Sequence, residues 1–118
     1  MGVAVILVED DALIRMMIVE MLEELGHRVV AEAGNVTHGR SLACSADFEV
    51  ALLDINVGGE NILPVAQSVA ARGLPILFMS GYKADGLPDG FSKSPLLTKP
   101  FEVTKLREAM ETLVAKVN

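Results

Sequence analysis

Three carboxylates stand beside or within apolar runs of the chain, where charged side chains are not expected. Glu9 and Asp10 directly follow the run at residues 3–8, and Asp54 is the one charged residue in the run at residues 50–55. Carboxylates that are crowded together repel one another, so a site that keeps all of them ionised at neutral pH needs a cation. Oxygen ligands with few protein contacts favour Mg²⁺, which keeps several waters that a phosphoryl group can replace. The acids therefore predict an Mg²⁺ site.

A hydroxyl and a lysine follow two further apolar runs. Ser80 comes after residues 74–79 and can donate a hydrogen bond to a phosphoryl oxygen, and Lys99 comes after residues 96–98. Beside a metal ion, the lysine would offset charge on the phosphoryl oxygens while Asp54 attacks in line. These residue types predict transfer of a phosphoryl group to Asp54.

The elements that must position these residues alternate between strands and helices. The runs predicted to form strands are residues 3–8, 28–32, 50–55, 74–79 and 96–98. Apolar residues at helical spacing predict helices at residues 12–25, 36–45 and 61–72 and a last helix after Lys99-Pro100, although Gly39 weakens the second of them. This alternation predicts an α/β fold with a doubly wound, open, parallel sheet.

The carboxyl ends of parallel strands meet at one edge of such a sheet, and functional groups gather there. The residues predicted to converge at that edge are Glu9, Asp10, Asp54, Ser80 and Lys99. Taken singly, a strand-end serine is commonly a turn former and a lysine before proline is commonly solvated. Asp11 is expected only to cap the helix that follows it. The ordered set, rather than any one residue, indicates a site.

The segment between the fourth and fifth strands is predicted to be a loop with at most a short helix. Residues 83–94 include Gly86, Pro88 and Gly90 and show little helical periodicity.

Length and composition favour one compact domain, residues 1–118, with its own core, because 51% of the 118 residues are hydrophobic. A net charge of −6 leaves no basic patch for nucleic acid. The longest apolar run is far shorter than the roughly 20 residues that span a bilayer, so we expect a soluble cytoplasmic protein that does not bind membranes. Cys44, the single cysteine, is expected on a buried helix face, and the methionines are expected in the core.

Four segments together resemble the signature of the receiver domain of response regulators in two-component signalling. They are Val5-Ile6-Leu7-Val8-Glu9-Asp10-Asp11, Leu52-Leu53-Asp54-Ile55-Asn56, Met79-Ser80-Gly81-Tyr82 and Lys99-Pro100-Phe101. The resemblance covers essentially the whole chain and extends to a subgroup of single-domain receivers common in alphaproteobacteria. It implies a flavodoxin-like sheet with strand order 2-1-3-4-5 and a fourth helix that is short or missing.

The resemblance also implies a role for each site residue. Asp54 would be the phosphoacceptor, Asp10 and Asp54 would bind Mg²⁺ directly, and Glu9 would act largely through water. The backbone carbonyl of Asn56 would complete the protein ligands. Arg15 stands five residues after Asp10, an offset at which receivers often carry an arginine.

Ser80 would be the hydroxyl that responds to phosphorylation, and Lys99 would contact the phosphoryl group, with a cis bond to Pro100. Many receivers have an aromatic residue three positions before this lysine, where this chain has Leu96. Tyr82 is expected to take over part of that aromatic role.

A receiver would accept its phosphoryl group from a histidine kinase or a histidine phosphotransfer protein, and a downstream protein is a further candidate partner. It would be no enzyme beyond catalysing its own phosphorylation and dephosphorylation. The alternative is a phosphorylation-independent interaction module with the receiver fold. A phosphatase of the haloacid-dehalogenase type would have a second Asp where Asn56 stands. A flavodoxin-like cofactor binder would not place acids after the first strand, where they would repel a phosphate.

Overall fold

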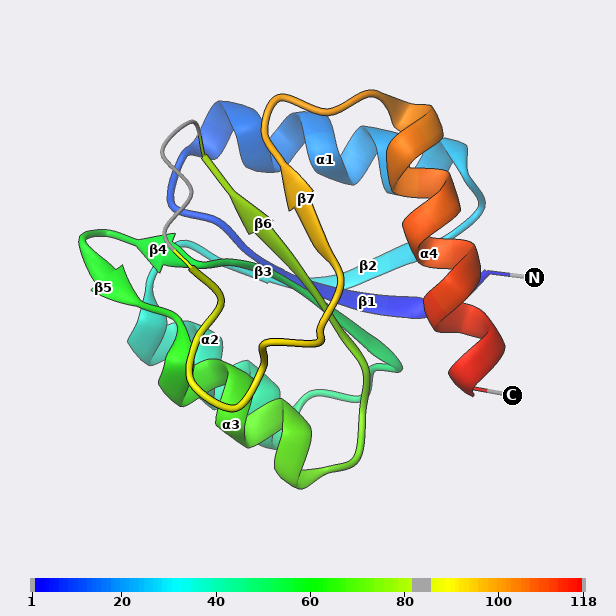
Figure 1. Cartoon of the computed structure of the whole chain (residues 1–118). Helices are drawn as coiled ribbons and strands as arrows, with labels where there is room; N and C mark the ends of the chain where they lie inside the picture. Colours follow the sequence, from blue (N-terminus) through cyan, green and yellow to red (C-terminus); the bar gives the residue numbers. More distant parts are fainter. Residues whose placement is uncertain (1, 82–85, 118) are drawn as a thin grey trace.

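The computed structural model describes residues 2–81 and 86–117, and its centre is a five-stranded parallel sheet (Figure 1). The strands of the sheet are β1 (Ala4–Val8), β2 (Arg28–Ala33), β3 (Val50–Asp54), β6 (Ile76–Ser80) and β7 (Leu96–Thr98). Their order is β2-β1-β3-β6-β7, and every neighbouring pair is parallel. Counted along this sheet alone, the order is 2-1-3-4-5, so the predicted flavodoxin-like topology is confirmed.

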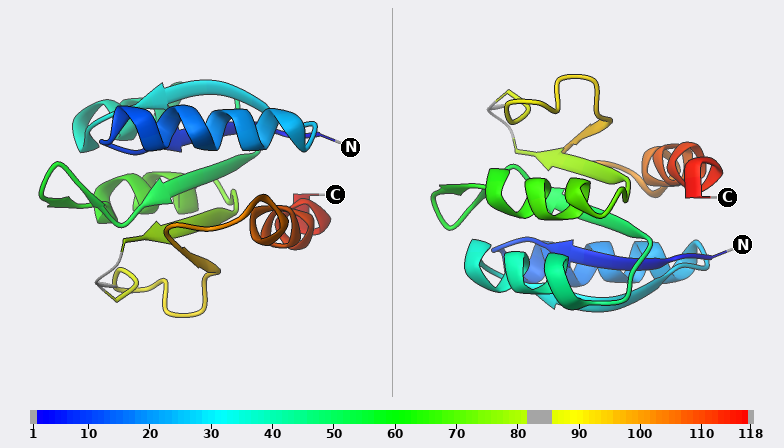
Figure 2. Two further views of the ribbon diagram at one scale, coloured as in Figure 1. Left: turned by 90° about the horizontal axis from the view of Figure 1, so that it is seen from above. Right: turned by 90° about the horizontal axis from the view of Figure 1, so that it is seen from below.

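Two pairs of helices cover the two faces of the sheet (Figure 2). One face carries α1 (Ala12–Glu24) and α4 (Val103–Val117), and the other carries α2 (Val36–Ser45) and α3 (Leu63–Ala71). Within the described residues, no helix is long and apolar enough to cross a membrane.

Local sequence explains where the helices begin. Asp11 Oδ1 accepts hydrogen bonds from the backbone N–H groups of Leu13 (2.9 Å) and Ile14 (3.1 Å), so Asp11 caps α1 as expected. Asn35 Oδ1 caps α2 in the same way, by accepting from the N–H of His38 at 2.7 Å. These caps satisfy donors that the first turn of a helix leaves without partners.

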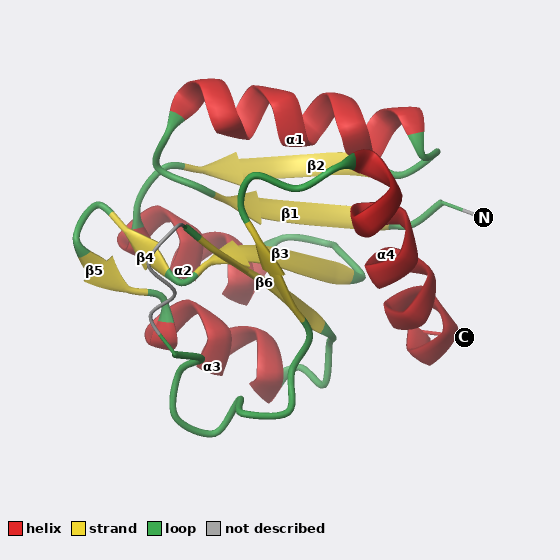
Figure 3. Ribbon diagram, turned by 45° about the horizontal axis from the view of Figure 1, so that its top comes forward, coloured by secondary structure: helices red, strands yellow, loops and turns green. Residues whose placement is uncertain are grey.

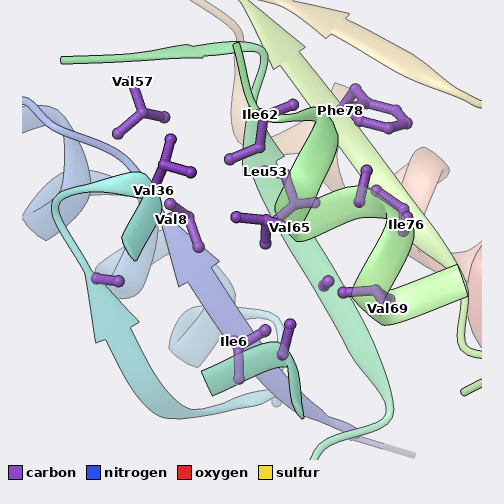
Figure 4. Close-up of a cluster of buried hydrophobic side chains, with 14 of the residues drawn as sticks. Ile6, Val8, Val36, Leu53, Val57, Ile62, Val65, Val69, Ile76 and Phe78 are labelled. Atoms are coloured by element: carbon purple, nitrogen blue, oxygen red, sulfur yellow. The ribbon is translucent and has the colours of Figure 1, made fainter. Parts of the chain in front are cut away.

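Successive side chains of the central strands point to opposite faces and build two cores. In β1, Ile6 and Val8 pack toward α2 and α3, whereas Val5 and Leu7 pack toward α1 and α4. Figure 4 shows the first of these clusters, in which the strand residues meet Val65 and other side chains of α3. Because β1, β3 and β6 are buried on both faces, they read in the sequence as apolar runs, with Asp54 and Ser80 as the polar last residues of β3 and β6.

Packing explains why a glycine, Gly39, stands in the middle of α2 despite its low helix propensity. It lies in the middle of α2 and is buried against the sheet. A Cβ atom at this position would lie 3.1 Å from Val8 Cγ2 and 3.3 Å from Val65 Cγ2. The absent side chain therefore lets α2 approach both β1 and α3.

We expect Gly39→Ala to lower the free energy of unfolding by about 1 kcal/mol. Helix propensity alone favours alanine by about 1 kcal/mol. Overpacking costs about 1–3 kcal/mol, and here the two neighbours are buried valines with stiff side chains, so the packing effect is the larger. Urea denaturation checks this, with Ser41→Ala at an exposed position of the same helix as the control. Greater stability of Gly39→Ala than of wild type would show that Val8 and Val65 move to make room for the added methyl group.

The structure adds a hairpin that the sequence did not predict. Strands β4 (Asn56–Val57) and β5 (Glu60–Asn61) pair antiparallel between β3 and α3. Gly58 and Gly59 form the turn with φ of +60° and +81°, values that strongly favour glycine. Figure 3 shows this hairpin at the edge of the sheet where β1 and β3 end.

The segment before β7 contains no helix within residues 86–95, in agreement with the predicted loop. Phe91 instead packs edge-on against Phe78, with ring centres 5.5 Å apart. It covers part of the face that a helix would otherwise cover.

Two predictions about burial are wrong. Cys44 is exposed on α2 rather than buried. Met16 and Met17 are also exposed, at 53% and 48%, although Met79 and Met110 lie in the core as expected. In Figures 1 and 3 α4 lies beside the C-terminal part of α1, so α4 does not cover the first turns of α1.

Candidate functional site

The predicted convergence of the acids is confirmed. Glu9 and Asp10 follow β1, Asp54 ends β3, and the two strands are neighbours in the sheet. One carboxylate oxygen from each residue lies within 4.8 Å of the others. Glu9 and Asp54 are buried, whereas Asp10 is exposed at the mouth of the cluster. Buried carboxylates of this kind need a positive partner.

Lys99 supplies that positive charge from the residue after β7. Its Nζ lies 2.7 Å from Glu9 Oε1 and 2.9 Å from Asp54 Oδ2, and donates a hydrogen bond to each. The Lys99 side chain is only 14% exposed, so water weakens these ion pairs less than it would on the surface. The Lys99–Pro100 peptide bond is cis, as the resemblance implied.

Burial and neighbouring groups both shift the pKa values of Glu9 and Lys99. Burial raises the pKa of Glu9 to about 7, with the Asp54 carboxylate adding to the rise and the hydrogen bond from Lys99 opposing it. For Lys99, burial alone would lower the pKa, but its bonds to Glu9 and Asp54 outweigh burial and raise it. The lysine is therefore held in its charged form beside the prospective nucleophile.

Asp10 is stabilised as a carboxylate by the unexpected hairpin. The backbone N–H of Gly58 donates to Asp10 Oδ2 at 2.8 Å. Burial would raise the pKa of Asp10, but this hydrogen bond and one with Glu9 outweigh burial and lower it. The sequence contained one signal for this contact, the Gly58-Gly59 pair, which is typical of a tight hairpin turn.

Ser80 presents a hydroxyl without a hydrogen-bond partner among the described residues. The residue is 2% exposed, and its Oγ is the one buried side-chain oxygen or nitrogen of that part of the chain with no partner. An unpaired buried hydroxyl costs about 1–3 kcal/mol, so its persistence calls for a functional reason. An arriving phosphoryl oxygen would accept its hydrogen bond.

The donor set fits Mg²⁺, because carboxylate oxygens are the hard ligands this ion prefers. Asn56 lies beside the acidic cluster. Its backbone N–H is 3.4 Å from Asp54 Oδ1, and it is the first residue of β4. The predicted role of its carbonyl as a ligand stays a prediction. Leu96 is 37% exposed on β7, and Tyr82, expected to take over an aromatic role, lies outside the described residues.

An apolar surface adjoins the site on the side of α1. Leu13, Met16 and Met17 are exposed there, Leu13 to 62%. Met17 also lines a groove of about 320 Å³, whose lining side chains are mainly apolar. Its wall also includes Lys99, the residue that forms ion pairs with Glu9 and Asp54.

Comparison with known proteins gives a family for this arrangement. Residues 5–111 match the family model of the response regulator receiver domain. The transcriptional regulatory protein PdtaR of Mycobacterium tuberculosis is 28% identical over 116 residues, which are 95% of this chain and 57% of PdtaR. The chain thus spans little more than half of that relative.

Solved structures agree with the fold. The solution structure of SdrG from Sphingomonas melonis Fr1 is 32% identical with a TM-score of 0.85, and the match covers 96% of this chain and 97% of SdrG. The receiver domain of the sensor histidine kinase PA1611 from Pseudomonas aeruginosa PAO1 is 20% identical with a TM-score of 0.79, over 98% of this chain and 99% of that domain. The PA1611 crystal structure has a magnesium ion coordinated in its active site cleft.

Proposed function

Because this chain belongs to the response regulator receiver domain family, we propose that it is a phosphoacceptor switch in which Asp54 is phosphorylated in an Mg²⁺-dependent reaction. The donor is a histidine kinase or a histidine phosphotransfer protein. Phosphorylation then changes the binding of a downstream protein, or the domain drains phosphate from a shared kinase. The observation that carries the proposal is the placement of Lys99 Nζ 2.9 Å from Asp54 Oδ2, beside the acidic cluster.

Mg²⁺ would be held by Asp10 and Asp54 directly, by Glu9 largely through water, and by the backbone carbonyl of Asn56. When bound, the ion neutralises charge on the phosphoryl oxygens. Asp10 suits this role, because it is exposed and its pKa is lowered.

The residues of the chain perform the transfer in a simple order. A carboxylate oxygen of Asp54 attacks the phosphorus atom of a phosphohistidine, a P–O bond forms, and the P–N bond breaks with its electron pair left on the imidazole nitrogen. Lys99 offsets the charge on the phosphoryl group. Ser80 Oγ donates the hydrogen bond for which it has no acceptor among the described residues.

The apolar surface of α1 supports a protein donor rather than a small-molecule one alone. Exposed Leu13, Met16 and Met17 would bind an apolar surface of the donor protein, because the groove that Met17 lines also includes Lys99 in its wall. Methionine side chains adapt to differently shaped partners, which suits a receiver served by more than one donor.

Incubation with acetyl phosphate and Mg²⁺ tests the proposal. Wild type is expected to gain one acid-labile phosphoryl group, seen by intact mass, and Asp54→Asn is expected to gain none. Asp11→Asn is the matched control, because Asp11 lies outside the cluster and asparagine also caps helices.

Two other outcomes would contradict the proposal. Absence of the adduct on wild type, also with a histidine kinase as donor, would favour the phosphorylation-independent interaction module. Continuous hydrolysis of unrelated phosphomonoesters would favour a phosphatase, since the proposed domain catalyses only its own phosphorylation and dephosphorylation.

A further inference from the structure

Arg15 connects α1 to the ends of two strands. Its Nη1 donates a hydrogen bond to the backbone carbonyl of Glu9 at 2.7 Å, and its Nε lies 3.2 Å from Glu32 Oε1. The guanidinium is well suited to hold two partners at once, because its N–H groups form a rigid fork. The bond to Glu9 is the stronger candidate for function, since that carbonyl belongs to the peptide unit that joins Glu9 to Asp10.

Gly34 provides the space for this contact. A Cβ atom at Gly34 would lie 3.1 Å from Arg15 Nη1 and 3.9 Å from the carbonyl oxygen of Glu9. Gly34 is not among the glycines with positive φ, so its backbone does not itself require glycine. The missing side chain instead leaves room for the guanidinium.

The Glu9 backbone is thereby held on both sides. Its N–H donates to the carbonyl of Ala33 at 3.0 Å, and its own carbonyl accepts from Arg15. A peptide unit is planar, so holding the Glu9 carbonyl also fixes the N–H and Cα of Asp10. Beyond that point, Asp10 is exposed, and its carboxylate is held by the N–H of Gly58 in the hairpin.

We propose that Arg15 is a positioning residue that, seated in the space left by Gly34, orients Asp10 toward Asp54 for Mg²⁺ binding. The proposal rests on the proposed function in that the acidic cluster binds Mg²⁺. This ion demands near-ideal octahedral geometry with short bonds, so a small displacement of one carboxylate weakens binding. Residues that orient metal ligands commonly change metal affinity by about tenfold or more when they are replaced.

Electrostatics alone predicts the opposite change in Mg²⁺ affinity when Arg15 is replaced. The positive charge of Arg15 repels a cation, so its removal would strengthen Mg²⁺ binding if charge were all that mattered. Positioning requires that removal weaken Mg²⁺ binding. The direction of the change therefore separates the two effects.

Isothermal titration with Mg²⁺ alone tests the proposal on the full chain. We expect Arg15→Gln to raise the Kd for Mg²⁺ about tenfold. Gly34→Ala is expected to raise the Kd by a smaller factor, because its Cβ, 3.1 Å from Arg15 Nη1, shifts the guanidinium without removing it. Glu32→Gln removes only the ion pair and should leave the Kd within about twofold. At saturating Mg²⁺, Glu32→Gln should be phosphorylated by acetyl phosphate at a rate close to that of wild type.

The possible failures can be told apart. An unchanged or lower Kd in Arg15→Gln, with an unchanged melting temperature, would overturn the positioning role. If Arg15→Gln fails to fold, an unchanged or lower Kd in Arg15→Lys, which keeps the charge but not the guanidinium fork, would overturn it. A wild type that binds Mg²⁺ and is phosphorylated, with Arg15→Gln equally tight, would overturn this inference and leave the proposed function intact. A wild type that binds no Mg²⁺ would overturn both.

Discussion

Lys99→Gln is expected to slow phosphorylation of Asp54 by acetyl phosphate about 100- to 1000-fold, the effect of removing one preorganised group that stabilises the transition state. Lys99 is the one cation that forms an ion pair with the buried acids among the described residues. Glutamine keeps a hydrogen-bond donor but loses the charge that offsets the phosphoryl oxygens. Rates measured at saturating Mg²⁺ check this prediction.

The same substitution should destabilise the protein in a pH-dependent way. Lys99 lowers the pKa of Glu9, so its loss raises that pKa further above its present value of about 7. Between the unfolded value of 4.5 and this raised value, the folded state binds more protons, so its stability grows as the pH falls. We expect a loss of about 2 kcal/mol at pH 8, where a buried carboxylate is left unpaired, and a smaller loss at pH 5.5.

Lys105→Gln is the matched control for both measurements, because Lys105 is exposed on α4 and its pairing with Glu108 spans 4.0 Å. It should leave the rate and the stability close to those of wild type. A loss of stability in Lys99→Gln that is equal at pH 5.5 and pH 8 would contradict the proposed link to Glu9.

Asp10→Asn is expected to remove most of the stabilisation that Mg²⁺ gives to the folded protein. A ligand at a hundred times its Kd stabilises the folded state by about 2.7 kcal/mol if it does not bind the unfolded chain. Asparagine can still accept the hydrogen bond from Gly58, so the hairpin contact is kept while the exposed ligand charge is lost. Urea denaturation with Mg²⁺ and with EDTA measures the difference.

Asp11→Asn again serves as the control, and it should keep the full Mg²⁺ effect because Asp11 caps α1 and lies outside the acidic cluster. If Asp10→Asn is stabilised by Mg²⁺ as much as wild type, the ion binds elsewhere or through Glu9 and Asp54 alone. That result would contradict the proposed ligand set.

The convergence of Glu9, Asp10 and Asp54 could be predicted from the sequence, because it follows from topology. Alternating strands and helices imply parallel strands, and the carboxyl ends of parallel strands share one edge of the sheet. The strands could be predicted because β1 and β3 are buried on both faces. A strand buried in this way is an apolar run in the sequence, and in β3 Asp54 is the only charged residue.

Exposure of particular side chains could not be predicted in this way. Helical spacing shows which residues of α1 share a face, but it does not show how far a neighbouring helix covers that face. Met17 belongs to the apolar side of α1 and is nevertheless 48% exposed, because α4 packs beside the other end of the helix.

The sequence by itself determined the fold class and the identity of the acids, the hydroxyl and the lysine, because these depend on periodicity and on rules of chain connection, and the strand order came from the resemblance to receiver domains. Only the tertiary structure decided how they are held: Arg15 on the Glu9 carbonyl, Gly58 on Asp10, and Ser80 without a partner among the described residues. Contacts between backbone atoms and distant side chains leave no periodic trace in a sequence. They depend on spaces such as those at Gly34 and Gly39, which exist only when the elements are packed together.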